Sequence, residues 1–249
     1  MHSTFDEIHA VLSRYTLPAL HTTASSEAWL AAHQRQSGLL IHPRLAVYSG
    51  RKDSVFAANY QNEAGEVATL CASSDADLRF YELAEGYQDA GSGEAAAATT
   101  LCYGMVAVEP GVDILLVCGD NRFDVEIAKK AASHCAGIDA EQVLPFLLKL
   151  QDAALFACVG ALMAAGFARI PVLAEGVTAQ LAAAVLNAFQ PGGASHIGFV
   201  NPLLPVLAAA PQWSFPGKPP GYAALLALQE VQLLAAERYA GLGSSGVGE

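Results

Sequence analysis

The residues with the clearest chemical potential follow a short apolar run, in the stretch CGDNRFDVEIAKK (118–130). Within a few positions it offers two carboxylates, Asp120 and Asp124, the amide of Asn121 and the guanidinium of Arg122. An apolar run that gives way to a helical pattern indicates a strand–turn–helix unit, and ligands of α/β proteins bind at such turns. Because a guanidinium binds phosphate through paired hydrogen bonds, the turn is a candidate anion site.

The same turn has a second interpretation. A phosphate cradle made of backbone N–H groups needs positive φ angles, which glycine supplies, and this turn keeps only Gly119. Asp124 and Glu126 would occupy the start of the next helix, where carboxylates repel phosphate. Asp124 would then be the N-cap of an ordinary helix. The turn is therefore either an anion site in which Arg122 replaces the glycines or a capped connection, and no metal site is expected.

The elements that must position this turn follow a regular pattern. Strands are expected at 44–49, 77–84, 112–118, 169–175 and 196–200. Helices are expected at 66–73, 92–108, 124–135, 140–151, 153–167, 178–189, 202–210 and 221–240. This alternation predicts an α/β fold, a three-layer, Rossmann-like parallel sheet flanked by helices.

Right-handed crossovers bring the carboxyl ends of parallel strands to one edge, so a site should draw on the turns that follow them. Beside 119–122, those turns hold the basic stretch Ser49–Lys52, then Glu175 with Gly176, and Asn201. His196 begins the last expected strand, and we interpret it as a core histidine. The sequence shows no Ser-His-Asp, zinc or dinucleotide-binding signature.

Three regions are expected along the chain. Residues 1–43 hold two amphipathic patterns, the second capped by Ser25 or Ser26, and predict a small helical N-terminal subdomain or arm. Residues 44–241 form the α/β domain, and 242–249 form a mobile tail. The apolar run 153–168 is short and rich in Ala and Gly, which favours a buried helix over a membrane span. The segment 176–217 lacks charged residues and is either core or a subunit interface.

Composition narrows the possible partners. Hydrophobic residues make up 53% of the chain and charged residues 15%, with a net charge of −11, so neither nucleic acid nor an anionic membrane is expected as a partner. The low charge favours a covering partner chain. Five cysteines without a C-x-x-C pair, and no secretory leader, predict reduced thiols and a cytoplasmic protein.

The segments GVDILLVCGDNRFDVEIAKKAA, AALFACVGALMAAGFARIPVLAEG and PGKPPGYAALLALQEVQLLAA occur in an order that resembles the nicotinate-nucleotide–dimethylbenzimidazole phosphoribosyltransferases. The resemblance covers roughly residues 40–240 and is weak before about residue 75. It implies a parallel α/β fold, a homodimer and transfer of phosphoribose from nicotinate mononucleotide to dimethylbenzimidazole. That step belongs to synthesis of the cobalamin lower ligand and needs no cofactor.

The departures from the family pattern lie where the resemblance places the chemistry. The motif G-E-M-G-I-G-N-T-T is represented by residues 119–127, which keep Gly119 and an acidic residue, Asp120. Gln151 and Asp152 replace paired glycines, and Glu175 replaces an aspartate before Gly176. In the late motif L-G-E-G-T-G-A, Lys218 replaces the glutamate that the family uses as general base.

The sequence therefore supports two hypotheses. One is a divergent phosphoribosyltransferase with altered or impaired activity, and the other is a non-catalytic relative that binds a nucleotide, an azole or a partner paralogue. Whether the protein is an enzyme stays open because of Lys218, and no catalytic residue is assigned. The predicted substrate-binding residues are Gly119, Asp120, Asn121, Arg122, Glu175, Gly176, Asn201, Gly217, Lys218 and Gly221.

Overall fold

The structure is a computed structural model of the 249-residue chain. It describes Glu7, Ala10 and residues 25–34, 38–50, 54–62, 65–83, 93–120, 123–204, 210–215 and 219–244. Most of the predicted N-terminal arm, including nearly all of its first amphipathic pattern, and the end of the tail lie outside the described residues. The division into three regions therefore stays a prediction.

The centre of the fold is a six-stranded sheet in the order β2-β1-β3-β4-β5-β6, with every neighbouring pair parallel. The strands are β1 Pro43–Ser49, β2 Asp77–Glu82, β3 Ile114–Gly119, β4 Val172–Glu175, β5 Ile197–Val200 and β6 Gln212–Trp213. The chain passes from β1 outward to β2 and then crosses to β3 on the other side of β1. The α/β fold class predicted from the sequence is confirmed.

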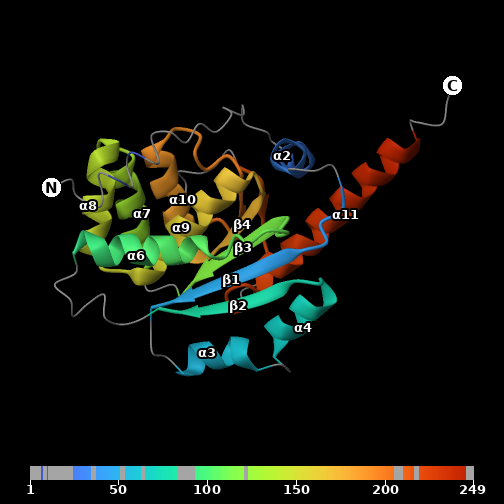
Figure 1. The fold of residues 1–249 in the computed structure, drawn as a ribbon, viewed down its shortest axis with the longest axis horizontal. Coiled ribbons are helices and arrows are strands. Elements are labelled where there is room, and N and C mark those ends of the chain that lie inside the picture. The colour runs from blue at the N-terminus through green and yellow to red at the C-terminus, as the bar shows by residue number, and fades with distance from the viewer. Residues whose placement is uncertain are drawn as a thin grey trace.

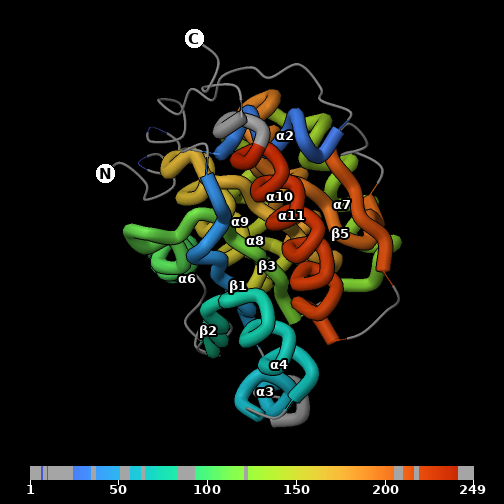
Figure 2. The backbone as a smooth tube through the Cα atoms, turned by 90° about the vertical axis from the view of Figure 1, so that its right-hand side faces the viewer, coloured from blue at the N-terminus to red at the C-terminus, as the bar shows by residue number. Residues whose placement is uncertain are grey.

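Helices cover both faces of this sheet (Figures 1 and 2). One face carries α6 Glu94–Met105, α7 Val125–Cys135, α8 Ala140–Leu150, α9 Ala153–Ala168 and α10 Gly176–Phe189. The other carries α2 Ser26–His33, α3 Ser54–Gln61, α4 Glu66–Ser73 and α11 Tyr222–Ser244. Each face has its own apolar core: in β1, Ala46 and Tyr48 join the first core, whereas Leu45 and Val47 join the second. This alternation follows from the two-residue period of a strand.

The helix α9 runs through the middle of the first core. Fourteen of its residues, Ala153–Gly166, are buried, and it packs closely on α6. Side chains at Gly104 of α6 or Gly160 of α9 would clash with the backbone of the facing helix, at Ala157 and Leu101 respectively. The apolar run is therefore a buried helix, as the sequence predicted, and its small residues allow two helix backbones to touch.

The charge-free segment is also explained in part by burial. Within α10, residues Val177–Leu186 are all buried in the monomer, so this part of 176–217 is core. No helix among the described residues is long and apolar enough to cross a membrane. All five cysteines are free, and only Cys102 is exposed.

Several boundaries differ from the sequence expectation. The helix α3 and the two-residue strand β6 were not predicted. α10 begins at Gly176 rather than at Thr178, because Gly176 has a φ of 85° and turns the chain directly from β4 into the helix. Residues 202–204 are not helical, and 205–209 lie outside the described residues. α11 continues to Ser244, into the segment predicted as tail.

Candidate functional site

The strand order places a topological switch point between β1 and β3. Connections leave these two neighbouring strands toward opposite sides of the sheet, and doubly wound proteins bind ligands at the carboxyl ends of such strands. Asp120 follows β3 directly, and Gly50 follows β1. The structure thus puts a predicted site residue at the position the fold favours for a site.

Asp120 ties the two strand ends together. Its Oδ2 accepts a hydrogen bond from the Gly50 backbone N–H at 2.9 Å and another from the Ser49 hydroxyl at 3.3 Å. The residue is only 5% exposed. A buried carboxylate is stabilised by such donors, which here come from the protein's own β1–α3 connection. Asp120 therefore holds the ends of β1 and β3 in a fixed relation to each other.

Gly119, which precedes Asp120, is required by close packing. A Cβ at Gly119 would come within 2.9 Å of the Thr178 side chain on α10. Real Cβ atoms do not approach so closely, so Gly119 allows the first turn of α10 to lie against the end of β3. This contact accounts for Gly119 without a phosphate cradle.

Asp152, which was not among the predicted site residues, lies close to these strand ends. It is the N-cap of α9, and its Oδ1 accepts a hydrogen bond from the Leu155 N–H at 2.8 Å. Burial raises the pKa of the Cys158 thiol, and the nearby charges of Asp152 and Asp120 raise it further. The first turn of α9 also faces Gly50, whose Cβ position lies 3.6 Å from that of Ala153. The sequence feature that could have drawn attention to Asp152 is the replacement of the paired glycines at 151–152.

Gln151 shows what that replacement costs locally. It has a φ of 50°, in the left-handed region, where it ends α8. Glycine occupies this conformation without strain, whereas a residue with a side chain does not. The resemblance assigns a glycine to this position, and Gln151 here adopts a backbone conformation that glycine would accommodate better.

Glu175, at the end of β4, forms the second anchored carboxylate of this edge. It is the N-cap residue of α10 but does not cap that helix. Its Oε2 instead accepts hydrogen bonds from the N–H groups of Gly221 at 2.9 Å and Ala224 at 2.8 Å, at the start of α11. Burial raises the pKa of Glu175 to about 7, against the opposing effect of the Ala224 and Gly221 N–H groups.

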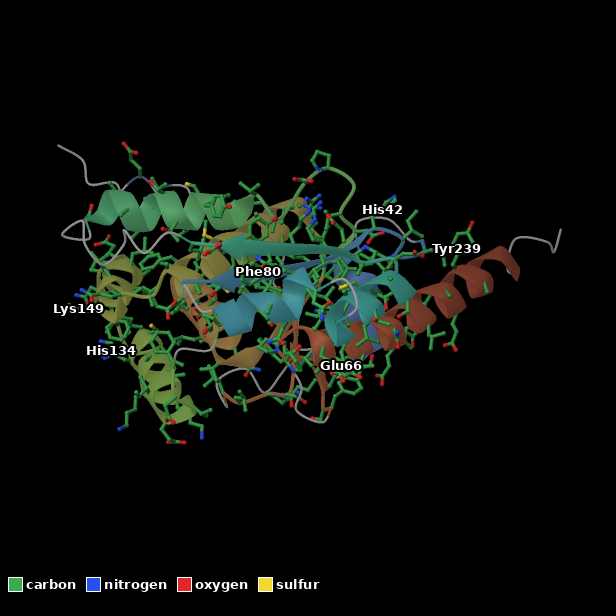
Figure 3. All side chains as sticks on the ribbon, turned by 90° about the horizontal axis from the view of Figure 1, so that it is seen from below. His42, Glu66, Phe80, His134, Lys149 and Tyr239 are labelled. Atoms are coloured by element: carbon green, nitrogen blue, oxygen red, sulfur yellow. The ribbon has the colours of Figure 1, made fainter. Side chains whose placement is uncertain are left out.

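The turn before α11 fits tightly onto the sheet. Gly221 has a φ of 92°, and a Cβ there would come within 2.9 Å of a methyl group of Leu45. The Tyr60 hydroxyl donates a hydrogen bond to the Pro220 carbonyl at 2.8 Å. The ring of Tyr60 stacks on Phe80 of β2, which Figure 3 labels beside the helices of this face. The predicted site residue Gly221 is thus required by conformation and by packing.

Asn201 has a structural role among the described residues. It has a φ of 49°, and its Oδ1 accepts a hydrogen bond from the Phe215 N–H at 2.7 Å. Its carbonyl accepts another from the Gln180 side chain at 3.1 Å. The first bond holds the ends of β5 and β6 together, and the second joins the end of β5 to α10, so the side-chain oxygen of Asn201 serves to hold the fold.

The remaining predictions divide into two groups. Asn121, Arg122, Gly217 and Lys218 lie outside the described residues, as does the basic pair that follows Gly50. Asp124 is the N-cap of α7, with Oδ1 accepting from the Glu126 N–H at 2.8 Å. No three or more His, Cys, Asp or Glu side chains come together as a metal site within the part of the chain that the structure describes.

Two grooves lie at the opposite, amino-terminal edge of the sheet. One of about 590 Å³ is lined by residues that include His42, Val112 and Ile170, and one of about 440 Å³ by His33 and Arg169 among others. Figure 3 labels His42 at this edge. Neither groove contains a predicted site residue, and the switch-point rule of α/β folds favours the carboxyl edge over them.

The fold and its strand-end carboxylates define a doubly wound α/β protein with a candidate site at the β1/β3 switch point. Curated sequence relatives carry the name nicotinate-nucleotide–dimethylbenzimidazole phosphoribosyltransferase. One from Rhizobium etli is 24% identical over 230 residues, covering 70% of this chain and 68% of the relative. One from Methylorubrum extorquens is 38% identical over 89 residues, covering 36% of this chain and 25% of the relative.

A solved structure of the same name, from Thermus thermophilus, superimposes with a TM-score of 0.59 at 13% identity and covers 96% of each chain. No family model matches the sequence. In sequence and in fold the chain is thus similar to the nicotinate-nucleotide–dimethylbenzimidazole phosphoribosyltransferases, and the resemblance stated from the motifs is confirmed. The departures from those motifs make it a divergent relative.

Proposed function

We propose that the protein is a divergent phosphoribosyltransferase that binds a phosphorylated ribose ligand, such as nicotinate mononucleotide, at the carboxyl edge of β1, β3 and β4. The observation that carries the proposal is the position of Asp120. It is the acidic residue kept from the family's first motif, and it lies buried at the switch point of the family's fold. The acceptor would be a flat azole of the dimethylbenzimidazole kind.

The activity is altered or impaired relative to those enzymes. Transfer to an azole needs a group that takes the azole proton, and general-base catalysis contributes roughly 10²–10⁴-fold to rate. Where the resemblance implies a glutamate base, this chain has Lys218. A lysine is protonated at neutral pH unless it is buried, so it does not replace a carboxylate base.

A second candidate is a non-catalytic relative that binds a nucleotide, an azole or a partner paralogue. One observation favours it: both strand-end carboxylates already accept hydrogen bonds from the protein's own backbone. Asp120 binds the Gly50 N–H, and Glu175 binds the Gly221 and Ala224 N–H groups. Carboxylates held in this way shape a binding edge and do not need to take part in chemistry.

A nicotinate-release assay with nicotinate mononucleotide and dimethylbenzimidazole separates the two candidates. For the divergent enzyme we expect slow but measurable release, which increases in a Lys218→Glu variant. Release at the rate of ordinary family members would contradict the impaired activity. If neither protein releases nicotinate, calorimetric titration with each ligand alone decides between a binding protein and one that binds neither.

The partners and location belong to the same proposal. A homodimer or a complex with a paralogue agrees with the low proportion of charged residues, 15%. We also propose a cytoplasmic location, because all five cysteines are free, and no nucleic-acid partner, because the net charge is −11. Light scattering at micromolar concentration tests the dimer: the mass of a single chain would rule it out.

A further inference from the structure

Glu175 joins two elements that are distant in sequence. It ends β4 and begins α10, yet its carboxylate binds the N–H groups at the start of α11. A helix start leaves its first N–H groups without partners inside the helix, and a carboxylate there is favourable. The helix α11 is therefore positioned by the side chain at the end of β4, one of the central strands.

The same short turn is held from two other directions. Tyr60 of α3 donates a hydrogen bond to the Pro220 carbonyl, at 2.8 Å. Gly221 lies against Leu45 of β1 and Cys118 of β3, with its Cβ position 3.6 Å from the Cys118 sulfur. Pro219–Gly221 directly follows Lys218 in the sequence and forms the described end of the late motif.

Glu175 differs from the other contacts because it can change charge. It is 7% exposed, and burial raises its pKa to about 7. The described titratable groups that face it are Cys118 of β3 and Tyr60 of α3. Burial raises the pKa of both, so both are neutral at pH 7 and Glu175 is the group that titrates there.

We propose that Glu175 is the positioning residue of the carboxyl edge: its carboxylate holds the Pro219–Gly221 turn and the start of α11 against β4, and ligand binding at this edge depends on its ionisation. The ligand-binding part rests on the proposed function, whereas the positioning part does not. An ionised Glu175 attracts the two N–H groups more strongly than a neutral carboxyl does. Binding therefore strengthens as the pH rises through the neutral range.

The direction in which Glu175 changes the free energy of unfolding with pH distinguishes a positioning residue from a simple helix cap. The folded pKa of Glu175, about 7, lies above its ordinary value of 4.5. Its contribution to stability is therefore complete below pH 4.5 and declines as the pH rises through 7. Ionised Glu175 thus lowers the stability of the fold, and such perturbed groups are typical of functional sites.

The test uses the full chain and a Glu175→Gln variant, which keeps the shape and an acceptor oxygen but cannot ionise. In the wild type, the NMR amide shifts of Gly221 and Ala224 are expected to titrate with a midpoint near 7. In Glu175→Gln this titration is expected to disappear. The matched control is Glu141→Gln, which removes an exposed carboxylate from the first turn of α8 and leaves the titration in place.

The second measurement is calorimetric binding of nicotinate mononucleotide at pH 6 and pH 8. We expect several-fold tighter binding at pH 8 in the wild type and no such difference in Glu175→Gln. Glu175→Asp, which keeps the charge but is one methylene shorter, should weaken binding at both pH values. Amides that do not titrate, or a pH dependence unchanged in Glu175→Gln, would overturn the inference. Titrating amides without binding at either pH would support the positioning role and contradict the proposed function.

Discussion

The carboxylate of Asp120 accepts a hydrogen bond from the backbone N–H of Gly50 at 2.9 Å, which joins the end of β3 to the end of β1. In doubly wound folds, ligands bind outside the carboxyl ends of strands in this position. In many such folds, backbone N–H groups at this edge are available to an anion. Here one of them is already bound to a carboxylate, so a phosphate at the switch point would need other donors.

Replacing Asp120 by alanine should lower the free energy of unfolding by about 1.5–3 kcal/mol, the range for a hydrogen bond to a charged group. The reason is that the Gly50 N–H would lose its acceptor at a part-buried position. Urea unfolding measures the change. Ser49→Ala is the control: it removes the longer, 3.3 Å contact with Asp120 and leaves the Gly50 bond in place, so a smaller effect of about 1 kcal/mol or less is expected. Equal losses in both variants would show that the Gly50 contact is unimportant.

The contact between α6 and α9 leads to a second prediction. Alanine has the higher helix propensity, yet Gly160→Ala should destabilise the protein by about 1–3 kcal/mol or more, because the added methyl group would clash with the Leu101 carbonyl. Thermal and urea unfolding report the loss. Gly38→Ala is a suitable comparison, since nothing lies within 4 Å of its Cβ position. A Gly160→Ala protein as stable as the wild type would mean that the two helices separate easily.

The sequence predicted those parts of the fold that local signals determine. The helix Glu66–Ser73 has the predicted bounds, and the predicted cap Asp124 bonds its own helix. The strand Gln212–Trp213 could not be predicted, because two residues carry no periodicity and the strand exists only by pairing with β5. The direct passage from Glu175 into α10 depends on the φ of Gly176, which a sequence does not reveal.

The candidate site was predictable in location and not in detail. Asp120, Glu175 and Asn201 were expected at strand ends, and all three lie there. Their hydrogen-bond partners come from elements distant in sequence: Gly50 for Asp120, Gly221 for Glu175 and Phe215 for Asn201. Only the three-dimensional fold shows that these polar groups bind the protein itself.

Two buried histidines predict how stability depends on pH. His33 of α2 and His196 before β5 have ring centroids 6.3 Å apart, and burial lowers the pKa of each to about 4. The neutral forms therefore stabilise the fold above the ordinary value of 6.5, and this contribution is lost as the pH falls from 6.5 through 4.

His33→Phe, which cannot titrate, should reduce this acid-induced loss by roughly 1–2 kcal/mol of unfolding free energy. The measurement is urea unfolding at a series of pH values, in which the slope with pH and not the absolute stability is compared. His42→Phe serves as the control because the His42 side chain is exposed. An identical slope in the wild type and His33→Phe would contradict the buried neutral histidine.

Arg44 and Arg79 bind the same carboxylate in different surroundings, and this difference leads to the last prediction. The Arg44 side chain is 8% exposed and bonds Asp77 of β2, Glu109 and the Ala107 carbonyl. The Arg79 side chain is 54% exposed and bonds Asp77 alone, at 2.9 Å. Arg44 thus joins β1, β2 and the connection that leads to β3, whereas Arg79 joins two neighbours on one strand.

Arg44→Met should therefore lower the free energy of unfolding by about 2–4 kcal/mol, because the Ala107 carbonyl loses its donor, Glu109 loses its counter-charge and Asp77 keeps only that of Arg79. Arg79→Met should change it by about 0–1 kcal/mol, as expected for an exposed ion pair. Each variant removes one positive charge, so the difference between them isolates the buried network from the change in net charge. Urea unfolding in low and high salt completes the test: salt should diminish the small Arg79 effect and leave most of the Arg44 effect, since buried pairs are screened less. Equal effects would show that the Arg44 network contributes no more than a surface pair.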